Sequence, residues 1–130
     1  MEEKRMVTNE IEVTLRVIGG KWKPLILNYL RYEGTKRYSE IVRYLQTAPK
    51  KTVTSQLREL EADGIVERNV IPTVPVQVEY SITEHGKTLY PILKAMCEWG
   101  FLHAGERYGL SHPTCGCEKK GKGGGTCPGE

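Results

Sequence analysis

The stretch that decides the fold is residues 39–64, SEIVRYLQTAPKKTVTSQLRELEADG. Apolar residues recur at helical spacing on both sides of an interruption at Thr47-Ala48-Pro49. This spacing predicts a short helix with Ser39 as its N-cap, and then a longer helix over residues 50–63 that Gly64 ends. Two helices joined by a short turn, the second with a basic first half, form the layout of a helix-turn-helix.

The second helix of this pair carries the candidate DNA contacts. Val53, Leu57 and Leu60 share one face and predict its buried side. The other side and the helix entrance offer groups suited to phosphates and base edges: Lys50, Lys51, Thr52, Thr54, Ser55 and Arg58. Outside this helix, Arg37 is expected to contact the DNA backbone and Arg68 to reach the flanking groove.

The charge distribution gives this helix a direction. Residues 36–58 hold six basic side chains and one acid, whereas residues 59–67 hold four acids and no base. A recognition helix enters the major groove by its N-terminal half, so this order fits the reading of DNA. A basic helix side also occurs on ordinary solvated surfaces, and the net charge of +3 does not by itself indicate a polyanionic partner.

The sequence before the helix pair predicts two further helices. The first carries Ile11, Leu15 and Ile18 at spacings of four and three and stops at Gly19-Gly20. The second is apolar nearly all round, as expected of a central buried helix, and ends at Gly34. A brief extended piece is expected just before Ser39.

The sequence after the helix pair changes from helical to strand periodicity. Residues 65–71 and 76–82 are two strand-like runs separated by a proline-containing tip, which predicts a β-hairpin. Thr83 is expected to cap a long final helix whose broad apolar face suits burial against a partner. The predicted fold class is therefore mainly α with a small β-hairpin wing, a winged helix-turn-helix.

Four sequence blocks, in this order along the chain, resemble those of HxlR-type transcriptional regulators. The blocks are Ile18-Gly19-Gly20-Lys21-Trp22, Arg37-Tyr38-Ser39-Glu40, Leu57-Arg58-Glu59-Leu60-Glu61-Ala62-Asp63-Gly64 and Val78-Glu79-Tyr80-Ser81-Ile82-Thr83-Glu84-His85-Gly86. The resemblance covers residues 9–101 and implies a DNA-binding winged helix that dimerises through its first and last helices. The expected function is sequence-specific regulation of transcription by a homodimer on a palindromic operator. A winged-helix module that binds proteins and not DNA is the alternative.

Two departures from the family pattern bear on DNA contact and on sensing. Pro49 stands where a serine usually caps the recognition helix, and proline offers no capping oxygen. Many members carry Cys-Pro about ten residues before the glycine pair, and in some that cysteine is a redox switch; here Asn9 and Glu10 hold those positions. If this protein senses oxidants, another cysteine must do so, and Cys97 on the final helix is the candidate.

The composition changes near Leu110. Residues 1–110 are expected to form the DNA-binding domain, and the Gly-, Lys- and Cys-rich residues 111–130 a flexible tail. The tail holds a possible set of soft metal ligands, namely His112, Cys115, Cys117 and Cys127. Metal binding, thiol redox chemistry and an inert tail all remain open, as does a small core role for Cys97.

The remaining features exclude whole classes of function. A chain of 130 residues suits one domain, and no apolar run approaches the roughly 18 residues that cross a bilayer, so a cytoplasmic protein is expected. No paired carboxylates, nucleophile-base set or phosphate loop stands out, so neither an enzyme nor a cofactor is expected. The expected partners are double-stranded DNA and a second copy of the chain, with an unidentified effector left open.

Overall fold

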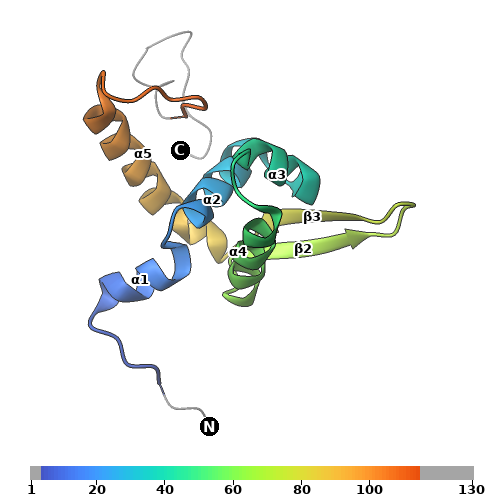
Figure 1. The fold of residues 1–130 in the computed structure, drawn as a ribbon. Helices are drawn as coiled ribbons and strands as arrows, with labels where there is room; N and C mark the ends of the chain where they lie inside the picture. Colours follow the sequence, from blue (N-terminus) through green and yellow to red (C-terminus); the bar gives the residue numbers. More distant parts are fainter. Residues whose placement is uncertain (1–3, 115–130) are drawn as a thin grey trace.

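The computed structural model describes residues 4–114 and has a helical body with one protruding hairpin (Figure 1). The helices are α1 (Glu10–Ile18), α2 (Trp22–Glu33), α3 (Tyr38–Leu45), α4 (Lys50–Ala62) and α5 (Tyr90–Ala104). A 3-10 helix, η1 (Gly86–Leu89), precedes α5, and the strands are β1 (Lys36–Arg37), β2 (Val66–Ile71) and β3 (Gln77–Ile82). The predicted fold class, a mainly helical winged helix-turn-helix, is confirmed.

The sheet has three antiparallel strands in the order β1-β3-β2. Arg68 of β2 lies opposite Tyr80 of β3, and Lys36 of β1 lies opposite the same Tyr80. The extended piece before α3 therefore adds a short third strand to the predicted hairpin. Because β1 leads directly into α3, this pairing ties the base of the wing to the helix-turn-helix.

The hydrophobic core lies where α2, α3 and α4 meet the sheet. Ile26 of α2, Ile41 of α3, and Val53, Leu57 and Leu60 of α4 are all 0% exposed. Val53, Leu57 and Leu60 recur at spacings of four and three along α4, so one face of this helix is fully buried and the other is left to solvent. The prediction of the buried face of α4 is confirmed.

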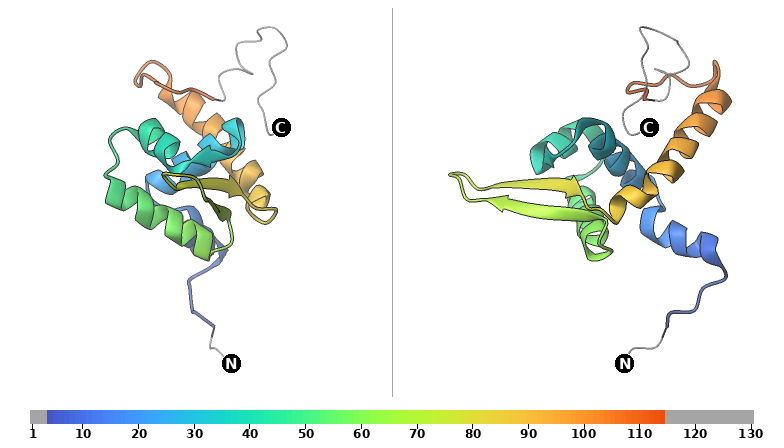
Figure 2. Two further views of the ribbon diagram at one scale, coloured as in Figure 1. Left: turned by 90° about the vertical axis from the view of Figure 1, so that its right-hand side faces the viewer. Right: turned by 180° about the vertical axis from the view of Figure 1, so that it is seen from behind.

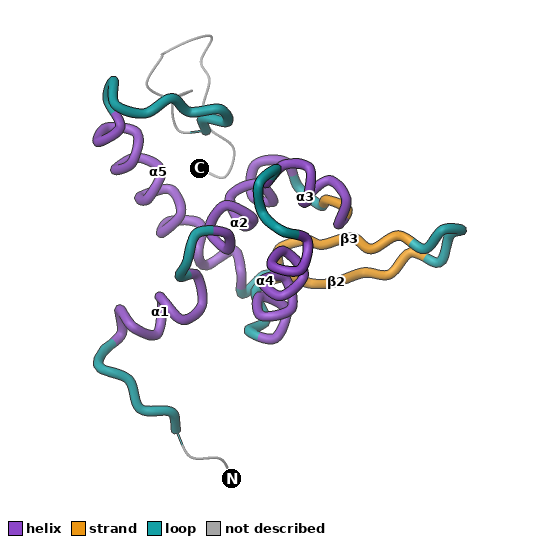
Figure 3. Tube along the Cα trace, viewed as in Figure 1, coloured by secondary structure: helices purple, strands orange, loops and turns teal. Residues whose placement is uncertain are grey.

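The first and last helices join this core at one end each, through Ile18 of α1 and Leu93 of α5. α1 and α5 extend from the body on the side opposite the β2-β3 hairpin (Figures 1 and 2). In Figure 3 the loop between α3 and α4 runs on the same side of the body as the base of the hairpin. Neither α1 nor α5 is long and apolar enough to cross a membrane, and the same holds for the other helices of residues 4–114.

Two predicted helix caps are wrong. The N-cap of α3 is Arg37 and not Ser39, because the Glu40 carboxylate reaches back and accepts a hydrogen bond from the Arg37 backbone N–H at 2.9 Å. Thr83 does not cap the final α-helix: its hydroxyl accepts a hydrogen bond from the backbone N–H of Gly86 at 2.9 Å in the turn before η1, whose N-cap is His85. The final α-helix begins later, at Tyr90.

Candidate nucleic-acid interface

The outer face of α4 presents the predicted DNA-binding side chains to solvent. Lys50, Lys51, Ser55 and Arg58 are exposed, while Thr52 and Thr54 are half-buried. The acidic Glu59, Glu61 and Asp63 follow at the C-terminal end of the helix. The basic side chains and the free backbone N–H groups of the first turn therefore lie at the same end, which is the end suited to phosphate.

The start of α4 is held by a tyrosine of α3. The helix begins at Lys50 with Pro49 as an N-cap that makes no side-chain hydrogen bond. The Tyr38 hydroxyl lies 2.9 Å from Thr54 Oγ1 and donates to the Lys50 carbonyl at 3.4 Å. Tyr38 thus joins α3 to the first turns of α4, where Pro49 supplies no capping oxygen. The Thr54 hydroxyl is therefore already hydrogen-bonded within the protein.

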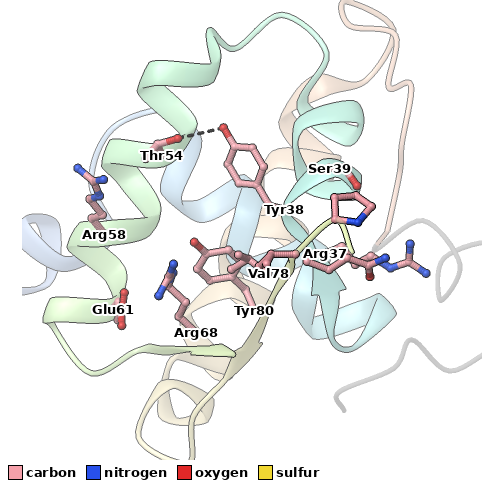
Figure 4. A pocket seen from close by; sticks show the side chains of 12 residues that line it. Arg37, Tyr38, Ser39, Thr54, Arg58, Glu61, Arg68, Val78 and Tyr80 are labelled. Atoms are coloured by element: carbon pink, nitrogen blue, oxygen red, sulfur yellow. Dashed lines mark hydrogen bonds between the residues drawn. The ribbon is translucent and has the colours of Figure 1, made fainter. Parts of the chain in front are cut away.

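A cleft runs between α3, α4 and the hairpin. It is lined by Arg37, Tyr38, Arg58, Glu61 and Arg68, among others (Figure 4). Arg58 and Arg37 lie at opposite ends of the cleft, so their guanidinium groups are spread along it. The structure therefore brings three of the predicted arginines to one surface together with the outer face of α4.

Arg68 has a partner inside this cleft. Its guanidinium lies beside the Tyr80 side chain (Figure 4). Burial raises the pKa of Tyr80 above its usual value, and the Arg68 contact opposes that rise in part. The Tyr80 phenol therefore stays protonated at neutral pH, and it positions Arg68 at the junction of wing and cleft.

An ion pair between a buried lysine and a half-exposed glutamate of α4 was not predicted from the sequence. Lys23 of α2 is 5% exposed, and its Nζ lies 2.5 Å from Glu59 Oε1 on α4. The signal was present: Lys23 precedes the buried Ile26 and Leu27 by three and four residues, which places it on the buried face of α2. Glu59 and Arg58 are neighbours on α4, so this pair fixes the helix from behind while Arg58 faces outward.

The candidate redox and metal residues lie elsewhere. Cys97 of α5 is a half-buried free thiol whose Sγ accepts a hydrogen bond from Asn28 Nδ2 at 3.5 Å. His112 stacks at a tilt on Tyr44, and its Nδ1 lies 2.9 Å from Ser111 Oγ. Cys115, Cys117 and Cys127 lie outside the described residues. Within residues 4–114 no group of three His, Cys, Asp or Glu side chains is placed to hold a metal ion.

The position that holds a cysteine in many family members has a structural role here. Asn9 is the N-cap of α1, and its Oδ1 accepts a hydrogen bond from the Ile11 backbone N–H at 3.0 Å. An asparagine side chain is among the best acceptors at such a position. The residue therefore supports the start of α1.

The outer faces of α1 and α5 expose an unusual amount of apolar side chain. The exposed residues are Ile11, Val13 and Leu15 on α1, with Ile92, Met96, Trp99 and Leu102 on α5. Trp99 and Leu102 are 67% and 68% exposed. Exposed apolar side chains in this number mark an interaction site.

The fold and the basic outer face of α4 place this protein in the class of winged helix-turn-helix proteins. The model of the HxlR-like helix-turn-helix family matches residues 17–108, and the chain belongs to that family. The chain is 47% identical over 107 residues to the uncharacterized HTH-type transcriptional regulator YtcD of Bacillus subtilis (strain 168), covering 82% of this chain and 84% of YtcD. The resemblance to HxlR-type transcriptional regulators is thus confirmed.

Solved structures agree with this assignment. A crystal structure of the HTH-type regulator YtcD matches with a TM-score of 0.70 and 47% identity, over 74% of this chain and 97% of that one. The redox regulator HypR in its reduced form matches with a TM-score of 0.69 and 49% identity, over 75% of this chain and 98% of HypR. The relatives are regulators of transcription, and some of them respond to redox state.

Proposed function

We propose that this protein regulates transcription by binding a palindromic operator as a homodimer, with α4 as the recognition helix. The observation that carries the proposal is the outer face of α4, where Lys50, Lys51, Ser55 and Arg58 are exposed and the apolar residues are all buried. Every side chain on that face donates hydrogen bonds, and three of the four are cationic. Such a face complements phosphates and the acceptor edges of bases.

The side chains of this face have separate roles in the proposal. Lys50 and Lys51 at the helix start contact phosphates, which gives affinity without sequence preference. Arg58, about two turns further along, pairs with the O6 and N7 acceptors of guanine in the major groove. Thr52 and Ser55 offer short hydrogen-bonding groups, while Thr54 holds Tyr38 and contributes its methyl group. Arg37 and Arg68 extend the positive surface to the flanking backbone.

The homodimer rests on the apolar faces of α1 and α5. These faces lie on the side opposite the wing, so a second copy can cover them without touching α4 (Figure 2). A two-fold axis there gives two recognition helices, and helix-turn-helix dimers place theirs about 34 Å apart, one turn of DNA. Two-fold symmetry in the protein then requires a palindromic site.

The proposal includes a response to oxidants or metals, for which the chain offers two alternative sites. Cys97 is a half-buried thiol on α5, so its oxidation would alter the helix that we assign to the dimer interface. His112, Cys115, Cys117 and Cys127 are the alternative, as soft ligands for zinc or copper(I). HypR, a relative of similar fold, is a redox regulator.

The test is binding of the purified protein to its own upstream DNA across a salt series. A labelled upstream fragment and a shuffled fragment of equal composition are titrated, and the dissociation constant is measured between about 50 and 300 mM salt. We expect a preference for the upstream fragment and a log-log slope of about −7, since the four proposed backbone contacts of each subunit make eight in the dimer and each contributes about −0.9. Parallel titrations with mild oxidant and with chelator test the two cysteine hypotheses.

The result that would overturn the proposal is equally clear. If neither fragment binds at the lowest salt, with or without oxidant or chelator, the basic face of α4 does not serve DNA. The protein-interaction module then becomes the better description. Equal binding of both fragments with the expected slope would retain DNA binding and reject sequence-specific recognition.

A further inference from the structure

Two hydroxyl groups meet where α3 packs against the first turns of α4. The Tyr38 hydroxyl of α3 lies 2.9 Å from Thr54 Oγ1 (Figure 4) and 3.4 Å from the Lys50 carbonyl oxygen. Tyr38 and Thr54 are both half-buried, and both line the cleft between α3, α4 and the hairpin. The pair therefore lies on the same surface as Arg58, which lines that cleft too.

The chemistry of the three contacting groups decides which hydroxyl donates to which. The Lys50 carbonyl oxygen can only accept, so its contact with Tyr38 uses the single O–H of the phenol. The Tyr38 oxygen must then accept in the 2.9 Å contact, and Thr54 is the donor there. The O–H of Thr54 is thus used within the protein, and the lone pairs of its oxygen are the part of that hydroxyl left for DNA.

The backbone that carries Tyr38 is held on both sides along the chain. Strand β1 ends just before it, at Arg37, which lies opposite Glu79 of β3. The helix α3 begins at Tyr38, and the Glu40 carboxylate accepts a hydrogen bond from the Arg37 backbone N–H at 2.9 Å. The sheet and the helix cap therefore fix the place of the phenol, so the Thr54 hydroxyl is oriented before any ligand arrives.

The position of Thr54 on α4 places this hydroxyl among the proposed DNA contacts. Lys51 precedes Thr54 by three residues and Arg58 follows it by four, so the three share one helix face. Both neighbours are exposed cations, and lysine and arginine side chains donate hydrogen bonds but accept none. Between them, Thr54 supplies an acceptor, which can receive a hydrogen bond that neither cation can.

We propose that Tyr38 is a positioning residue that makes Thr54 a hydrogen-bond acceptor toward DNA, so that the base facing Thr54 is adenine or cytosine. In the major groove adenine N6 and cytosine N4 donate, whereas guanine O6 and thymine O4 accept. An acceptor base opposite Thr54 would leave both oxygens without a donor, which costs affinity once water is excluded. The inference rests on the proposed DNA binding by α4 and adds the class of base that one position selects.

The test measures base preference along the upstream site. Each base pair of the site is replaced in turn by the other three, and the affinity of the protein for every duplex is measured by competition in fluorescence anisotropy. For the parent we expect one position in each half-site where adenine or cytosine binds about threefold to tenfold better than guanine or thymine, and where this depends on Thr54.

Two substitutions of Thr54 identify that position. Thr54→Val keeps the shape of the side chain and removes the hydroxyl, so it should lose the preference at this position and at no other. Thr54→Ser is the conservative variant, and it should keep the preference because serine supplies the same hydroxyl.

Tyr38→Phe tests the positioning role. It frees the Thr54 O–H to donate to guanine or thymine, so the preference at the Thr54 position should shrink below about twofold, while the preference at other positions persists. In the Thr54→Val background, Tyr38→Phe should change that position no further, because the two residues act through one hydrogen bond. Tyr44→Phe is the matched control: it removes a hydroxyl from the same helix, at a ring stacked on Tyr29, and should leave every base preference unchanged.

The outcomes separate this inference from the proposed function. Equal binding of upstream and shuffled DNA by the parent would reject sequence-specific recognition and this inference with it. If the parent prefers its upstream DNA, but Tyr38→Phe has an intact melting temperature and unchanged base preferences, this inference alone is overturned. A uniform loss at all positions in Tyr38→Phe would also overturn it, since Tyr38 would then only support the fold. So would a guanine or thymine preference that Thr54→Val removes, because Thr54 would then be a donor toward DNA.

Discussion

The outer face of α4 and the outer faces of α1 and α5 have opposite chemistry. On α4 all large apolar residues are 0% exposed, and the exposed side chains of its first nine residues are cationic or hydroxylic, with exposed acids following at the C-terminal end. On α1 and α5, residues as large as Trp99 and Leu102 are more than half exposed. The two faces lie on different sides of the body (Figure 2).

This comparison separates the residues that stabilise the fold of one chain from the residues that are available to bind a partner. The helix α4 completes its packing within one chain, since Val53, Leu57 and Leu60 are buried there, and its other face is free for a polyanion. The helices α1 and α5 each bury one large residue, Ile18 and Leu93, and leave their exposed apolar residues for a partner. Changes on the two faces should therefore affect different measurements.

The largest expected effect is loss of the dimer on replacing Trp99 by glutamate. A charge at the centre of an apolar contact should weaken the dimer by about 2–4 kcal/mol, so that sedimentation at micromolar concentration shows a monomer. DNA affinity should fall as well, because one recognition helix replaces two.

Val74→Glu is the matched control for that change. Val74 is 100% exposed on the wing, so the same apolar-to-acid replacement there should leave the dimer intact. If Trp99→Glu remains a dimer while its fold is intact, the assignment of the α1 and α5 faces is wrong.

The ion pair behind α4 predicts an asymmetry between its two partners. Glu59→Ala leaves the 5% exposed Lys23 ammonium without its partner and should cost about 1–3 kcal/mol of unfolding free energy. Lys23→Met fills the same buried space with an apolar chain and leaves Glu59 half exposed to water, so it should cost less. Urea unfolding of both variants measures this, with Glu61→Ala as an exposed control on the same helix. A larger loss in Lys23→Met would contradict the buried-charge argument.

Two substitutions on α4 separate base contact from phosphate contact. Arg58→Ala should weaken binding to the upstream DNA by about 1–3 kcal/mol and reduce the preference over shuffled DNA. Lys51→Ala should weaken both DNAs alike and make the salt slope shallower by about two units, about one for each subunit of the dimer. Fluorescence anisotropy titrations at several salt concentrations distinguish them. Parallel behaviour of the two variants would show that Arg58 contacts the backbone only.

Sequence patterning predicted the helix α4 well and its supports poorly. The buried face of α4 and its start at Lys50 follow from the spacing of Val53, Leu57 and Leu60, because local periodicity carries that information. The contact of Tyr38 with Thr54 joins residues 16 apart in sequence and depends on how α3 packs. The cap of α3 was misplaced because serine is the commoner N-cap, whereas here Glu40 supplies the acceptor for the Arg37 N–H. The Tyr38–Thr54 contact depends on tertiary packing, which the local sequence pattern does not determine.

The smallest expected effect concerns pH and the half-buried tyrosines away from both faces. Burial raises the pKa of Tyr44 above 10.0, so the folded chain keeps a proton that the unfolded chain loses above that pH. The stability that this proton represents is complete below pH 10 and is lost as the pH rises through the folded pKa. Tyr44→Phe keeps the stacking on Tyr29 but removes the titration, so its unfolding free energy should fall less between pH 9 and pH 11, measured by urea unfolding. Tyr108→Phe, at a tyrosine 62% exposed, should keep the steeper alkaline loss of the parent. Equal loss of unfolding free energy with pH in Tyr44→Phe and the parent would show that the Tyr44 hydroxyl is hydrated in solution and that burial does not raise its pKa.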